Sequence, residues 1–251
     1  TKDVLTAMPI LMTTGNGAGN PVVNAASLEN RGFEFSLGWR EKRKDFSYYA
    51  SLNFSTVKNK VTSLGYGRVD IISGQGRTAV GRPIGEFYLI KTDGIFQNDD
   101  EIQSYKNSVG KVIQPDAKPG DIKYIDFNDD GKITEADRTW IGDPSMPELV
   151  YGFGASLKYK GFDFSFLLQG AGNRSTYLTG GWYFQPFQAD RSPKYMGNVM
   201  TMFLDRWTED NPNPNAFSPR LSYGANANNY KASTWWQRDA SYLRIKNIEL
   251  G

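Results

Sequence analysis

The stretch at residues 126–137, DFNDDGKITEAD, holds the residues whose types and spacing are best suited to chemistry. Oxygen-bearing side chains stand at alternate positions, a glycine occupies the sharp-turn position, and this pattern matches a calcium-binding loop. The candidate metal ligands are Asp126, Asn128, Asp130, Lys132 (through its backbone carbonyl), Thr134 (through a water) and Asp137. The sequence therefore predicts a bound structural cation, Ca²⁺ rather than Mg²⁺. The alternative is a turn rich in Asp, Asn and Gly that holds no metal.

The segments beside this loop argue against a calcium sensor of the EF-hand type. The preceding residues, DIKYI, are typical of a strand, and Pro144 and Pro147 prevent a long helix after the loop. Asp137 also replaces the longer glutamate of the usual pattern, which makes bidentate coordination less certain. Because no pair of helices is present to open, a cation here would brace a loop.

Composition removes most enzyme classes from consideration. The chain has 251 residues and contains neither histidine nor cysteine, so a histidine base, a thiol nucleophile and a zinc site of the usual kind are excluded. Carboxylate chemistry remains, as in a glycoside hydrolase, although the pair Asp99 and Asp100 is better explained as charges at a helix start. With 29 basic and 27 acidic residues, the chain has no electrostatic pattern for nucleic-acid binding.

Alternating apolar and polar residues predict long antiparallel strands. One hairpin is expected at residues 32–40 and 46–55, with a charged turn between them. A second is expected at 151–159 and 162–169, and a last strand within 241–251 needs a bulge near Asn247 to keep its apolar residues in phase. Each strand has one apolar face and one polar face.

Strands of this length are typical of a membrane barrel. A tilted barrel strand needs about 9–11 residues to cross a membrane, whereas strands of soluble sandwiches average about 5–6. Trp39, Tyr151 and Tyr159 at strand ends fit an aromatic girdle. Long irregular stretches separate the hairpins, and one contains a short helix capped by Asn98. The alternative is a large soluble sandwich whose apolar faces form its core.

Several dissimilar motifs, taken together in order and spacing, resemble the C-terminal half of SusC/RagA-type TonB-dependent outer-membrane transporters. They are NRGFEFSLGWR (30–40), FSYYASLNFSTVKNKV (46–61), GRPIGEFYLIKTDGIFQNDDEI (81–102), KPGDIKYIDFNDDGKITEADRTWIGDPSMPELVYGF (118–153), RWTEDNP (206–212) and ASYLRIKNIELG (240–251). The resemblance implies an all-β fold in which residues 1–251 form part of an antiparallel transmembrane barrel of about 22 strands with long loops. The plug domain and the TonB box are expected to lie outside these residues, and the loop at 126–137 matches a family motif.

The resemblance also implies a function. The whole protein would be an active importer of oligosaccharides or peptides in the outer membrane of a Gram-negative, Bacteroidetes-type bacterium, and not an enzyme. Its partners would be TonB and a SusD-like surface lipoprotein. Four loop aromatics, Trp182, Tyr183, Trp235 and Trp236, are candidates for stacking on cargo, although ordinary loop packing explains them as well. The alternative function is a secreted, calcium-stabilised β-sandwich that binds carbohydrate.

Overall fold

The computed structural model describes residues 2, 4–7, 22–65, 70–179, 200–222 and 226–251. The chain divides into two compact units, and each is described by itself. The first unit comprises residues 1–87, 142–176 and 239–251, and the second comprises residues 88–141 and 177–238. Among the described residues, no helix is long and apolar enough to span a membrane.

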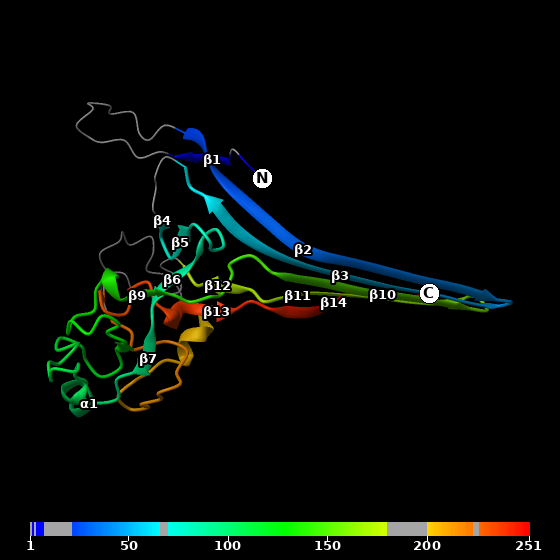
Figure 1. The fold of residues 1–251 in the computed structure, drawn as a ribbon. Coiled ribbons are helices and arrows are strands. Elements are labelled where there is room, and N and C mark those ends of the chain that lie inside the picture. The colour runs from blue at the N-terminus through cyan, green and yellow to red at the C-terminus, as the bar shows by residue number, and fades with distance from the viewer. Residues whose placement is uncertain (1, 3, 8–21, 66–69, 180–199, 223–225) are drawn as a thin grey trace. The chain divides into compact units, whose positions relative to one another are not determined.

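The first unit is built on a six-stranded antiparallel sheet with the order β1-β2-β3-β10-β11-β14. Its strands are β1 (Val4–Ala7), β2 (Val22–Arg43), β3 (Phe46–Ser63), β10 (Leu149–Tyr159), β11 (Phe162–Gly172) and β14 (Tyr242–Leu250). Figure 1 shows the long strands β2, β3, β10, β11 and β14 running side by side. The sheet does not close on itself within this chain, and the strands predicted from alternation are confirmed.

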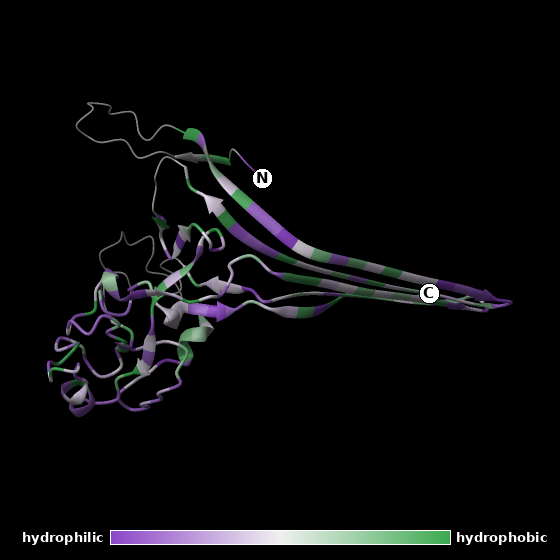
Figure 2. Ribbon diagram, in the orientation of Figure 1, coloured by the Kyte–Doolittle hydropathy of each residue, from purple (hydrophilic) through white to green (hydrophobic). Residues whose placement is uncertain are grey.

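Register places the large apolar side chains on one face of this sheet, called here the apolar face. One row of neighbours across five strands is Leu37, Leu52, Phe153, Leu168 and Ile245. The next row, towards the N-terminal end of β2, contains Phe35, Phe54 and Tyr151. Many of the side chains in these two rows are exposed. Figure 2 shows the resulting alternation of hydrophobic and hydrophilic residues along the strands. The intervening residues form the opposite, polar face.

Two tight turns join the hairpins. Lys44 and Lys160 adopt positive φ values of 46° and 44°, and Gly161 follows with 93°. Left-handed backbone at these positions matches the right-handed twist of the paired strands. The turn at Lys160 and Gly161 is the one predicted. The first turn is shorter than predicted, because strand pairing continues to Arg43 and leaves only Lys44 and Asp45 between the strands.

A bulge keeps β14 in phase with its neighbour, as predicted. Leu167 pairs with Asn247, and Leu168 pairs with Ile245, so Lys246 is skipped in the ladder. The extra residue returns the alternate apolar residues of β14 to the apolar face. Without it, a slip of one residue would turn them to the polar face.

One glycine allows an aromatic ring to lie flat across the sheet. Gly170 pairs with Tyr151, and a Cβ added at Gly170 would lie 2.3 Å from the ring of Tyr151. The hydroxyl of Tyr151 donates a hydrogen bond to the carbonyl of Tyr242 at 3.4 Å. The ring therefore bridges β10, β11 and β14, and any larger residue at position 170 would displace it.

The first unit also contains a smaller antiparallel ladder. It is formed by β4 (Asp70–Ser73), β5 (Gly76–Ala79) and the beginning of β6 (Glu86–Ile90). The rest of β6 belongs to the second unit, where Tyr88 faces Trp140 of β9. The chain also forms the short strands β12 (Ser175–Tyr177) and β13 (Gln237–Asp239).

The second unit has short elements around a compact core. Besides its part of β6, it contains β7 (Thr92–Ile95), α1 (Asp99–Ser104), β8 (Ile122–Tyr124), η2 (Glu135–Asp137), β9 (Arg138–Trp140), η4 (Thr201–Leu204) and η5 (Thr234–Trp236). The cap predicted for α1 is present, because the side chain of Asn98 accepts a hydrogen bond from the amide of Glu101 at 2.8 Å. Its main buried cluster consists of Ile90, Ile122, Tyr124 and Trp236.

Candidate functional site

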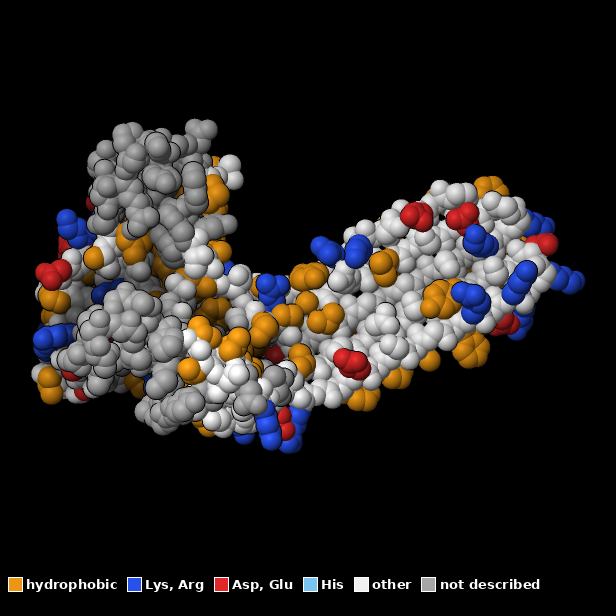
Figure 3. Space-filling view, turned by 90° about the horizontal axis from the view of Figure 1, so that it is seen from above, with side chains coloured by type: hydrophobic (Ala, Val, Ile, Leu, Met, Phe, Trp, Pro, Cys, Tyr) orange, Lys and Arg blue, Asp and Glu red, His pale blue; other side chains and the backbone are white. Residues whose placement is uncertain are grey.

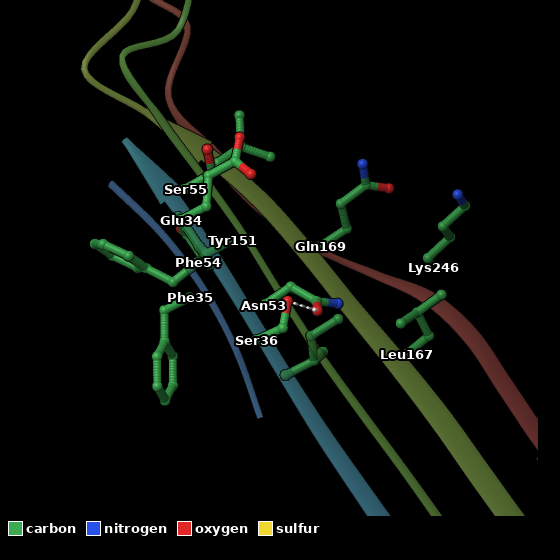
Figure 4. A pocket seen from close by; sticks show the side chains of 13 residues that line it. Glu34, Phe35, Ser36, Asn53, Phe54, Ser55, Tyr151, Leu167, Gln169 and Lys246 are labelled. Carbon is green, nitrogen blue, oxygen red and sulfur yellow. Dashed lines mark hydrogen bonds between the residues drawn. The ribbon is translucent and has the colours of Figure 1, made fainter. Parts of the chain in front are cut away.

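The polar face of the large sheet carries hydrogen-bonding side chains in register. Ser36 donates a hydrogen bond to the side-chain oxygen of Asn53 at 3.2 Å, and Arg244 donates one to Gln169 at 3.4 Å. Figure 4 shows Gln169 and Lys246 on the opposite side of the strands from Phe35 and Phe54. A shallow groove of about 450 Å³ follows these strands. The sheet therefore has one polar face, which can form hydrogen bonds with water, and one apolar face.

The first half of the predicted metal loop is folded around Asp126. Its carboxylate accepts hydrogen bonds from the amides of Asp130 at 3.2 Å and Gly131 at 2.7 Å. The side-chain oxygen of Asn128 accepts from the same Asp130 amide at 3.1 Å, so oxygens of Asp126 and Asn128 lie close together. The side chain of Asp130 in turn accepts from the amide of Lys132 at 2.9 Å. Three of the predicted ligands thus share one cluster.

Asp137 is engaged in a different way. Its side chain is fully buried, and one oxygen accepts from the amides of Phe127 at 3.0 Å and Asn128 at 3.4 Å. The other oxygen accepts from the amide of Thr134 at 2.7 Å, which completes a capping box with η2. Backbone amides can satisfy a buried carboxylate as a cation would.

The loop brings the predicted ligands together in two groups. Among the described residues, no group of three or more acidic side chains is placed to hold a metal ion. Asp126, Asn128 and Asp130 share one cluster, and the carboxylate of Asp137 accepts hydrogen bonds from backbone amides. A cation in this loop remains a prediction, and the loop as folded is held by its own amides.

A second segment fastens the tip of the loop. Asp129 has a positive φ of 59°, and its carboxylate accepts hydrogen bonds from the amide of Ser108, at 3.0 Å, and from the Ser108 hydroxyl. These bonds lower the pKa of Asp129 below its ordinary value. Asn107 donates to the carbonyl of Asp129 at 3.2 Å, and Lys111 donates to that of Asp130 at 3.4 Å. The neighbouring chain therefore braces the loop.

A buried polar junction, which sequence reasoning missed, organises the second unit. Asp121 is almost fully buried, and its carboxylate accepts hydrogen bonds from Arg220 at 2.6 Å and from the side-chain amides of Asn226 at 3.0 Å and Asn229 at 3.1 Å. Its other oxygen accepts from the amide of Lys118 at 3.0 Å. Arg220, Asn226 and Asn229 lie 99, 105 and 108 residues from Asp121 in sequence, so no local pattern could have revealed these contacts.

The same junction continues into β8. The side-chain oxygen of Asn229 accepts from the amide of Ile122 at 2.9 Å, and that of Gln114 accepts from the amide of Tyr124 at 2.7 Å. The hydroxyl of Tyr124 donates to the carbonyl of Asn228 at 2.6 Å. Burial raises the pKa of Tyr124 well above its ordinary value. β7 pairs with one edge of β8, and side chains satisfy the backbone amides that have no strand beside them.

Lys123 forms a charged cluster on the other side of β8. Its ammonium lies 2.9 Å from Glu101 and 3.1 Å from Asp93, and it stands over the rings of Tyr105 and Phe96 at 5.4 and 6.0 Å. Burial lowers the pKa of Lys123, but the hydrogen bonds to Glu101 and Asp93 more than offset that effect and raise it overall. The cluster ties α1 and β7 to β8.

The structure places two of the four candidate cargo aromatics in the interior. Trp236 is 1% exposed and donates a hydrogen bond from its indole nitrogen to the carbonyl of Asn229 at 2.9 Å. Trp235 is half-buried and packs against the two hydrophobic clusters of the unit. Trp236 therefore acts as core in this structure, whereas Trp235 keeps part of its surface exposed and stays a predicted cargo contact. Trp182 and Tyr183 lie outside the described residues.

Comparison with known proteins places this geometry in a family. No family model matches the chain. It is 31% identical over its whole length to TonB-dependent receptor P26 of Formosa agariphila and 28% identical to receptor P3 of that organism. It is 24% identical to TonB-dependent receptor SusC of Bacteroides thetaiotaomicron. The fold matches the structure of the RagAB peptide transporter with a TM-score of 0.68 over 99% of this chain, at 21% identity.

The chain belongs to the SusC/RagA-type TonB-dependent receptors. It spans about a quarter of the length of these relatives: 24% of P26 and 23% of SusC. This membership places the receptor in the outer membrane of a Bacteroidetes-type bacterium, in a family whose members are not enzymes. The alternatives of a secreted sandwich and a carboxylate-only hydrolase are thereby set aside.

Family membership also explains the two faces of the receptor's sheet. β10 has 11 residues. At about 3.3 Å per residue and a tilt of about 40°, a strand of that length rises roughly 25 Å, which is the height of the apolar band of a membrane barrel. The apolar face therefore meets lipid, and its exposed side chains need no protein partner.

Proposed function

We propose that this chain forms part of the barrel wall and one loop-rich unit of an active outer-membrane importer of oligosaccharides or peptides. The observation that most directly supports this proposal is an open sheet with one continuous apolar face and one polar face, in a chain of the SusC/RagA family. A barrel wall must be apolar towards lipid and polar towards its lumen. The polar face around Ser36, Asn53 and Gln169 would line the lumen of the whole receptor.

The proposed partners are TonB and a SusD-like surface lipoprotein. The RagAB structure is of a peptide transporter, which supports peptide cargo, whereas oligosaccharide cargo rests on the resemblance to the SusC type alone. The buried network at Asp121 and the half-buried cluster at Lys123 fasten the described segments of the second unit to one another. Segments already fixed in this way suit contact with a surface partner, because little ordering entropy is lost when they bind.

The test uses the whole receptor in its own cells. Cells with and without the receptor gene are given a pool of labelled oligosaccharides and, separately, a pool of labelled peptides. We expect one pool to accumulate only when both the receptor and TonB are present. Accumulation that persists without TonB would contradict active import, and accumulation of neither pool would contradict the cargo class.

A further inference from the structure

A cationic groove interrupts the apolar face at the end far from the tight turns. It has a volume of about 730 Å³ and lies between β2, β3 and the start of β10. Phe33, Phe54 and Leu149 form its apolar part, and Phe33 is 60% exposed. Three cations line it, Arg31, Lys58 and Lys60, together with two carboxylates, Glu29 and Glu148, and Glu29 stands opposite Lys60 in register.

Register puts these cations on the lipid-facing side. Arg31 lies two residues from Phe33 along β2, and Lys58 lies four residues from Phe54 along β3, so both share the face of these phenyl rings. At the level of the groove β2 and β3 pair with each other, β10 joins β3 from Thr56 onwards, and β1 reaches only residues 22–26 of β2. Further strands would add beside these strands, in the plane of the sheet, and would leave this face uncovered.

The positive charges in the groove are only partly neutralised. Arg31 and Lys58 stand directly opposite each other, and like charges opposite each other destabilise a sheet. Arg31 contacts Glu29 at 2.7 Å, and Glu148 accepts a hydrogen bond from Asn173. Lys58 and Lys60 form no ion pair with any acidic side chain in the described parts of the chain. An external anion would relieve this repulsion.

Position along the barrel wall indicates the kind of anion. Short turns of membrane barrels face the periplasm and long loops face outwards, so the groove lies at the outer boundary of the apolar band. Lipid phosphates lie at this level, directly above acyl chains, and the groove has cations above phenyl and leucine side chains. Figure 3 shows Lys and Arg side chains beside hydrophobic ones along the sheet.

We propose that this groove binds lipid A, the phosphorylated glycolipid of the outer leaflet. Lys58, Lys60 and Arg31 hold a phosphate, and an acyl chain lies on Phe33, Phe54 and Leu149. Each basic side chain near a membrane surface strengthens binding of anionic lipid about fivefold, so a pair of lysines has a measurable effect. The proposal concerns the outer wall of the receptor and does not depend on its cargo.

The test measures lipid binding to the whole purified receptor by native mass spectrometry in detergent. The probes are diphosphoryl lipid A, monophosphoryl lipid A and phosphatidylglycerol. The test variant is Lys58→Gln with Lys60→Gln. The matched control is Lys42→Gln with Lys158→Gln, two exposed lysines near the tight turns that both pair in register with Ser47 on the polar face.

We expect the test variant to weaken diphosphoryl lipid A binding about tenfold or more, and the control to change it less than about twofold. Wild-type receptor should bind the diphosphoryl form more tightly than either other lipid, and rising salt should weaken binding. Equal lipid A affinity in the test variant and wild type would overturn the site. Equal binding of phosphatidylglycerol would overturn its assignment to lipid A. The salt series on wild type decides the electrostatic claim even if the test variant fails to fold.

Discussion

The two units of this chain are stabilised by different interactions. The sheet of the first unit keeps its large apolar residues, such as Leu52 and Phe153, exposed for lipid and relies on ladder hydrogen bonds between long strands. The second unit has few regular elements and is held by a buried tryptophan and by Asp121 with its partners. Regular strand pairing is needed where lipid offers no hydrogen bonds to backbone N–H and C=O groups. An irregular backbone is tolerated where side chains form hydrogen bonds with those groups.

The largest expected effect comes from the core of the second unit. Trp236→Ala should cost about 3–5 kcal/mol of local stability, because it leaves a cavity and removes the hydrogen bond to Asn229. Hydrogen exchange on the whole receptor should show lost protection in β6 and β8, with the large sheet unchanged. Trp39→Ala on the apolar face is the matched control, and an equal loss there would abolish the contrast between the units.

A charge on the apolar face should produce the next largest effect. Leu52→Arg places a guanidinium near the middle of the lipid-facing band, at a cost of about 2–4 kcal/mol. Asn53→Arg puts the same side chain on the neighbouring residue, which faces the polar side. We expect Leu52→Arg, but not Asn53→Arg, to lower the free energy of unfolding of the receptor, measured by urea unfolding in lipid bilayers. Equal destabilisation by both variants would contradict the two-faced sheet.

High pH should weaken the second unit selectively. Burial raises the pKa of Tyr177 to about 12, partly offset by the amide of Ser233 and the charge of Arg138. Its folded pKa exceeds the unfolded value, so its contribution is complete below pH 10 and is lost as pH rises towards 12. The loss should reach about 2–3 kcal/mol. Hydrogen exchange between these pH values should show it, and Tyr177→Phe should remove the part of the pH dependence that Tyr177 supplies while leaving that of the buried Tyr124.

Removing divalent cations should have the smallest effect. Asp137 accepts hydrogen bonds from three backbone amides, of Phe127, Asn128 and Thr134. Asp137→Ala should therefore destabilise the loop by about 1–3 kcal/mol, because water replaces part of the lost hydrogen bonds at this exposed loop. A chelator should change hydrogen exchange in residues 126–137 much less than this substitution does. A chelator effect as large as that of Asp137→Ala would establish the predicted cation as the brace of the loop.

Much of the sheet was predictable because its signal is local. Alternation assigned the faces of β2, β3, β10 and β11, and the offset of apolar residues in β14 required the bulge found at Lys246. The cap of α1 followed from Asn98 and Glu101 alone. The extra length of β2, from Val22 to Arg43, was missed because charged and polar residues interrupt the apolar alternation at both ends.

The candidate site was harder to predict because its residues have more than one use. Asp126, Asn128 and Asp130 come together as the spacing indicates, but the same spacing also suits a turn whose carboxylates accept backbone amides. Residue type likewise made Trp236 a cargo candidate, since a tryptophan suits a sugar platform and a core equally well. Neither choice can be made before the surroundings of each side chain are known.

By itself, the sequence determined which residues share a face, where the tight turns fall and which enzyme chemistries are absent. These properties depend on neighbours a few residues apart and on composition. Only the tertiary structure decided that Asp121 meets Arg220 and Asn229, that Asp137 is closed by amides, and that Lys58 lies opposite Arg31 beside a lipid-facing groove. Those contacts depend on which distant segments pack together, because burial makes a charge or an indole structural and exposure leaves it free to bind.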